Sequence, residues 1–140
     1  MVNDIIDGIV IKLDSVFGAD SVIHTEGVEQ DFKEPCFYVK LLSANQKQIL
    51  NNRYYLQHSL DIHYFPGTPD KNSEMFETAS RLSALEYVTS GGNLIRGTKM
   101  NYQTVDGVLH YFVDYNYYAY LSKEEAEKMQ RLTVHNGIGG

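Results

Sequence analysis

The sequence lacks tryptophan, has a single cysteine, and contains no apolar run near the ~18 residues that a membrane-spanning helix requires. One thiol, Cys36, cannot form an internal disulfide, so nothing indicates an oxidising compartment. The first eighteen residues have no basic stretch and carry acidic residues within their apolar part, which argues against a secretory signal. These absences predict a protein that is cytosolic where it is made and has no membrane partner.

Concentrated positive charge is missing as well. The formal net charge is −6, and the lysines and arginines are scattered along the chain. Proteins that bind nucleic acids usually carry a basic patch or stripe. The sequence therefore predicts no sequence-specific nucleic-acid partner. An acidic surface is still compatible with DNA that passes beside the protein without being bound.

What the sequence does have is enough length for one domain and many tyrosines. A chain of 140 residues can bury a core without a disulfide or metal. Tyrosine, present 11 times, suits sheet faces that are half wet or that meet another subunit. We expect residues 1–121 to form one domain. Residues 122–140 should form a polar helix, opened by a capping box at Ser122, and a flexible tail.

Two helices are predicted before this tail. Apolar residues recur at three- and four-residue spacing from Val2 to Phe17, and Gly18 is placed to end this first helix. A second helix is expected from Asp70 to Val88, stopped by the turn at Gly91-Gly92-Asn93. Its predicted buried stripe consists of Met75, Phe76, Ala79, Leu82 and Leu85.

Alternating segments predict the strands. Asp106-Gly107 lies between two of them and is typical of a two-residue hairpin turn. The resulting register places Thr104 opposite Leu109 and, further out, Lys99 opposite Asp114. Residues 44–52 are polar and turn-rich, so they are interpreted as a long hairpin loop or an extended arm. The other predicted strands are residues 21–26, 35–43 and 53–65.

This element order predicts an α+β fold. We expect a mostly antiparallel sheet of four to five strands with both helices packed on one face, plus a short C-terminal helix or arm.

A search for catalytic chemistry finds no signature. The five histidines have no metal-ligand spacing, and no glycine-rich segment has the context of a phosphate-binding loop. Asp61 and His63 share a strand face, which leaves open a metal or acid–base pair against the simpler reading of an exposed polar pair. Cys36 is expected to be a small buried hydrophobic residue. The sequence predicts no catalytic residue, no cofactor and no metal, and hence no enzyme.

Four segments together resemble one family. They are NDIIDGIVIKLDSVFG, EGVEQDFKEPCFYVKLL, NRYYLQHSLDIHYFP and GNLIRGTKMNYQTVDGVLHYFVDYN, and they span residue 3 to about residue 120. In order and spacing they resemble the small tail terminator proteins of prophages and phage-tail-like particles of Gram-positive hosts.

The resemblance implies a structural protein with no active site. Such terminators form rings, usually of six subunits, that bind the last ring of tail-tube protein, stop tube growth and offer a surface to the head or collar. The implied partners are other copies of the chain and the tail tube protein, with sheath, collar or head-completion proteins as further candidates. The implied location is the host cytoplasm during assembly and then the head-proximal end of the tail.

Two other readings stay open at this point. One is a head–tail completion protein that joins the neck. The other is a small ligand-binding module that uses the face of Asp61 and His63. For the assembly reading, the predicted contact residues are Gln46, Lys47, Gln48, Ile49, Leu50, Asn51 and Arg53.

Overall fold

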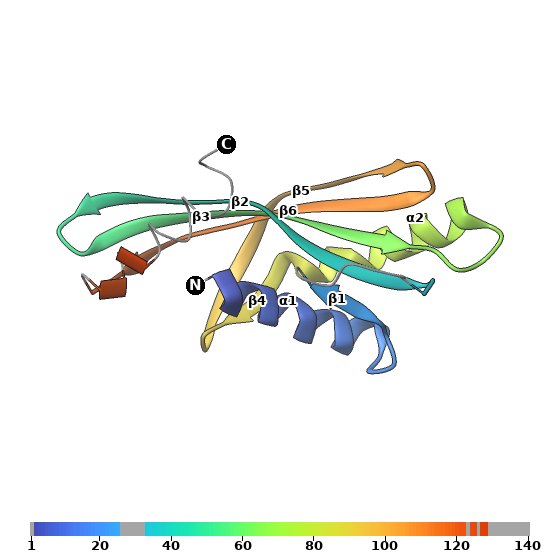
Figure 1. Cartoon of the computed structure of the whole chain (residues 1–140), viewed down its shortest axis with the longest axis horizontal. Helices are drawn as coiled ribbons and strands as arrows, with labels where there is room; N and C mark the ends of the chain where they lie inside the picture. The colour runs from blue at the N-terminus through green and yellow to red at the C-terminus, as the bar shows by residue number, and fades with distance from the viewer. Residues whose placement is uncertain (1, 26–32, 123, 126, 129–140) are drawn as a thin grey trace.

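In the part of the chain that the structure describes, six strands form one sheet in the order β1-β2-β3-β6-β5-β4 (Figure 1). The computed structural model describes residues 2–25, 33–122, 124–125 and 127–128. The strand β1 pairs in parallel with β2, and every other pairing is antiparallel. The strands are β1 (Ile23–Thr25), β2 (Cys36–Leu50), β3 (Arg53–Phe65), β4 (Tyr87–Ser90), β5 (Asn93–Val105) and β6 (Val108–Tyr120). The α+β class is confirmed, but the sheet is mixed and has six strands, not four to five.

The first helix, α1 (Val2–Phe17), has the predicted bounds. Gly18 follows it with φ of 102° and donates its N–H to the Asp14 carbonyl at 2.9 Å, which confirms the predicted C-terminal cap. Within α1, Gly8 lies against β4 so closely that a Cβ there would be 2.3 Å from the Thr89 carbonyl oxygen. This contact brings α1 onto the sheet.

The second helix is shorter than predicted. The helix α2 (Lys71–Leu82) begins after Asp70, whose side chain accepts a hydrogen bond from the Ser73 N–H. A 3-10 turn, η1 (Ser83–Glu86), then leads into β4, so Val88 lies in a strand. The run from Tyr87 to Thr89 is aromatic and β-branched, which favours a strand over a helix. The glycine pair predicted to stop the helix instead makes the turn between β4 and β5.

Both helices pack on the same face of the sheet. Side chains from α1 and α2 join those of one sheet face in a single core cluster, which confirms the predicted layering. Phe76 was expected in this core but is 54% exposed. Cys36 is buried, as predicted. The most deeply buried side chains of the cluster include Ile5, Ile9, Val39, Leu60, Ile62, Met75, Leu85, Leu109, Val113 and Tyr115.

The β5–β6 hairpin has the predicted turn, and its register holds from Val105↔Val108 out to Asn101↔Phe112. A bulge then shifts the pairing, so that Thr98 and not Lys99 lies opposite Asp114. Lys99 adopts a positive φ of 52° at this bulge. The bulge adds a residue to one strand, which no turn-based register could anticipate.

Residues 44–52, which were predicted to form a long hairpin loop or an extended arm, form an arm. The strand β2 continues to Leu50, and a turn at Asn51-Asn52 leads directly into β3. The end of β6 pairs with this hairpin. Residues 43–59 and 116–120 thus make a three-stranded arm, which extends beyond the helices (Figure 1).

Candidate functional site

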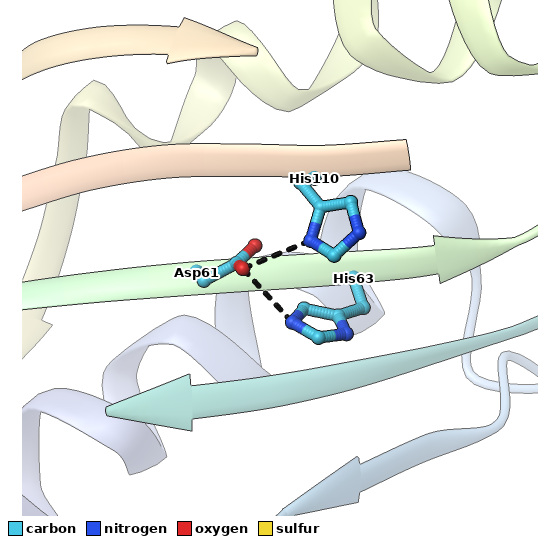
Figure 2. Close-up of side chains that lie close together, drawn as sticks. All are labelled: Asp61, His63 and His110. Atoms are coloured by element: carbon cyan, nitrogen blue, oxygen red, sulfur yellow. Dashed lines mark hydrogen bonds and ion pairs between the residues drawn. The ribbon is translucent and has the colours of Figure 1, made fainter. Parts of the chain in front are cut away.

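Two histidines and an aspartate meet on the sheet face that the helices do not cover. Asp61 and His63 alternate with the core residue Ile62 on β3, so they point away from the helices. His110 lies on β6 directly opposite His63. Figure 2 shows both imidazole rings turned toward the carboxylate.

A single carboxylate oxygen is the meeting point of this cluster. His110 Nδ1 is 3.0 Å from Asp61 Oδ2 and forms a hydrogen bond with it. His63 Nε2 is 2.9 Å from the same oxygen, yet it has no well-directed hydrogen-bond partner among the residues described. The two rings themselves are 4.4 Å apart between centroids.

The environment of Asp61 corrects the reading of an exposed polar pair. Asp61 is only 5% exposed, although it lies on the open sheet face. Burial by itself would raise the pKa of Asp61, but the contacts with His63 and His110 outweigh it, and the pKa lies below its ordinary value. Asp61 is therefore a buried, ionised group held between two imidazoles.

Aromatic rings surround the cluster. Tyr38 meets the His63 ring edge-on at 5.4 Å, and Phe112 stacks beside His110 at 6.4 Å. Sequence reasoning paired Asp61 with His63 because they are two residues apart on one strand. It missed His110, which is on another strand and is brought in only by the β3–β6 register.

Another histidine, His58, is buried on the opposite face. It is 1% exposed, and its Nδ1 lies 3.0 Å from the Tyr115 carbonyl, where it can donate. Its Nε2 is buried without a hydrogen-bond partner in the described part of the chain. Burial lowers the pKa of His58, which outweighs the raising effect of the bond to Tyr115.

This burial predicts a pH-dependent stability. The unfolded chain takes up a proton at His58 near the ordinary pKa of about 6.5, whereas the folded chain resists this protonation. The free energy of unfolding is therefore undiminished above that pH and decreases below it. The free energy of unfolding should decrease by up to about 1.4 kcal/mol per pH unit between pH 6.5 and the lower pKa that His58 has in the folded chain. Asp61 and Glu74, whose pKa values are also lowered, lose stabilisation only at more acidic pH.

Denaturant titrations at a series of pH values from about 8 to 5 measure this slope. His58→Gln should flatten it, while the matched replacement His24→Gln on β1 should not. An unchanged slope in His58→Gln would show that other groups cause the dependence.

The arm carries exposed apolar and aromatic side chains at its tip. Leu50 is 68% exposed, Tyr118 57% and Tyr120 73%. The Arg53 guanidinium lies 4.5 Å from the centre of the Tyr118 ring. The seven residues predicted for contact all lie on this arm, which the structure brings together with the two tyrosines of β6 that sequence reasoning did not single out.

A groove of ≈ 670 Å³ lies where the arm leaves β5. The pairing of β5 with β6 ends at Gly97↔Tyr115, and the two strands then diverge. Among the described residues, β6 is paired beyond this point only with β3, so one edge of residues 116–120 is open. Leu94 and Arg96 line the other wall of the groove.

None of the helices in the described part of the chain has the length and apolar character needed to cross a bilayer. The structure thus defines an α+β protein with one helix-covered sheet face, one open face and a projecting arm.

Residues 4–127 match the family model described as phage tail terminator protein. The chain belongs to this family, as the resemblance of its segments indicated, and the family is one of structural proteins of phage tail assembly. A comparison with curated proteins finds no match. One solved structure that matches is 12% identical, with a TM-score of 0.47, over 87% of this chain and 96% of the other.

Proposed function

We propose that the chain forms a ring that caps the finished tail tube, stops its growth and presents a surface to the head or collar. Its partners in this role are other copies of itself, in a ring of six by family resemblance, and the tail tube protein. Sheath, collar or head-completion proteins would bind the outer surface of the ring. The projecting arm with its exposed tip is the observation that carries the proposal.

The arm supports a contact role because the apolar side chains at its tip lie outside its own small core cluster, which is formed by Leu56 and Leu121 with Tyr54, Tyr117 and Ala119. Leu50, Tyr118 and Tyr120 stay largely exposed and belong to neither core cluster of the described residues. Tyrosine is enriched at protein interfaces, where its ring gives contact area and its hydroxyl gives a hydrogen bond. We assign the tip, together with the predicted residues from Gln46 to Arg53, to contact with a neighbouring subunit or the tube ring.

Open strand edges provide a second means of contact. Over the arm, β2 and β6 are each paired only with β3 among the described residues. The exposed N–H and C=O groups of such edges can pair with a strand of another chain. The groove beside residues 116–120 gives such a strand room to enter.

A ring made by one repeated head-to-tail contact needs only small individual interfaces. The rotation between subunits closes the ring, so no symmetric self-complementary patch is required. Small interfaces bind weakly in isolation. Free protein should accordingly be mostly monomeric at low micromolar concentration, with rings forming on tube ends that template them.

Removing the gene and imaging the particles by electron microscopy tests this function. A capping protein predicts tails of scattered, excessive length, because nothing then stops tube growth. Normal tails detached from heads would instead identify a neck-joining protein and contradict the capping role. Supplying the protein in trans should restore a uniform tail length.

A further inference from the structure

We propose that Asp61, His63 and His110 bind a divalent transition metal ion of the zinc type on the open sheet face. The proposal replaces the expectation from sequence that the chain holds no metal. It rests on the cluster alone and is independent of the capping function.

The donor set fits such an ion in type and number. Imidazole nitrogens suit zinc, cobalt and nickel, and two histidines with one carboxylate form a recognised triad for divalent metals. Each of the three residues offers one ligand atom, and these atoms all lie within 4.8 Å of one another. Magnesium and calcium prefer sets made of oxygen alone, so they do not match.

The distances are close to those in a metal site. Ligand atoms at 2.0–2.2 Å from a tetrahedral zinc ion lie roughly 3.3 Å apart. The two nitrogens are 2.9 and 3.0 Å from Asp61 Oδ2. To admit the ion, each nitrogen must move a few tenths of an ångström away from the oxygen. The two nitrogens, which lie within 4.8 Å of each other, must also come to about the tetrahedral spacing, and rotation of the side chains provides both movements.

Unsatisfied polar atoms indicate that hydrogen bonding alone does not complete the cluster. Asp61 Oδ1 and His63 Nε2 are both buried without a well-directed hydrogen-bond partner in the described part of the chain. Buried polar atoms almost always have a partner, and exceptions require an explanation such as an unseen ion. A cation among these atoms would give the carboxylate and the imidazole that partner.

The backbone holds the three ligands on a rigid platform. The strands β3 and β6 are the two central strands of the sheet. Asp61 and His63 share one face of β3, and His110 is the direct cross-strand neighbour of His63. Sites built on such elements keep their geometry better than sites on loops. The three ligands come from the sheet side, so the remaining coordination positions point away from it.

Untagged protein, stripped with a chelator, is dialysed against Zn²⁺ or Co²⁺, and bound metal is measured by elemental analysis. We expect one ion per chain, and with Co²⁺ a visible spectrum of low coordination number. His63→Ala and His110→Ala should each weaken binding by at least about tenfold, because loss of even an outer partner of a ligand costs that much. Asp61→Asn should do the same with little change in shape.

His24→Ala removes the same ring from β1 and should leave the affinity unchanged. Circular dichroism checks that every variant is folded. In the wild type, saturating Zn²⁺ should raise Tm by several degrees, and this rise should disappear in Asp61→Asn. Absence of bound ion in the wild type would overturn the proposal. Unchanged affinity in the three cluster variants would overturn it as well, since the ion would then lie elsewhere.

Discussion

Replacing Leu50, Tyr118 and Tyr120 together by serine should abolish tail capping while leaving the chain folded. These side chains are largely exposed, so their loss should change stability by no more than about 0.5 kcal/mol each. If they are buried against a partner, each should contribute as a hot spot of about 2 kcal/mol or more. Binding to tube ends should then weaken at least about a hundredfold.

The measurement is binding of the variant to isolated tail tubes, together with rescue of tail length in particles that lack the wild type. A matched control replaces Ile11, Phe76 and Tyr87, which are also exposed but lie on the helices and β4. The control should bind and rescue normally. Equal rescue by both variants would show that the arm tip is not a contact surface.

Tyr115→Ala should have the largest effect on folding, a loss of about 3–5 kcal/mol in the free energy of unfolding. The Tyr115 side chain is fully buried, and its hydroxyl donates to the Leu85 carbonyl at 2.6 Å. Removing the ring leaves a cavity between the sheet and η1. Burial also raises the pKa of Tyr115, so the hydroxyl stays protonated and able to donate.

Tyr115→Phe separates the two contributions, because it keeps the ring and removes only the hydroxyl. We expect a loss of about 1–3 kcal/mol, the cost of leaving the Leu85 carbonyl without its partner. Urea titrations of both variants give the comparison. Nearly equal losses in the two variants would show that the hydroxyl accounts for the stabilisation and that the ring contributes little to it.

Local signals in the sequence predicted much of this fold. The apolar stripe of α1 and the Asp106-Gly107 turn depend on neighbours a few residues away, and both were confirmed. The register near that turn followed from its length alone. The predicted register is wrong only beyond the bulge at Lys99.

Features that depend on distant partners were harder to predict. The residues Ala44 to Leu50 are mostly polar, with little β-branched or aromatic content, and they form a strand because β3 pairs with them. The Asp61 cluster needed the β3–β6 register, which no local pattern supplies.

The helix expected at Ser122 lies partly outside the described residues. Its predicted capping box is present, because Ser122 and Glu125 exchange the two hydrogen bonds of that motif.

The most direct measurement of tail-tube capping uses purified components. Tail tube protein is allowed to polymerise with increasing amounts of this chain, and tube lengths are measured by electron microscopy. A capping ring predicts shorter tubes as the ratio of chain to tube protein rises, with density for the chain at one tube end only. Tube lengths that do not change at any ratio, or binding along the whole tube, would contradict the capping function.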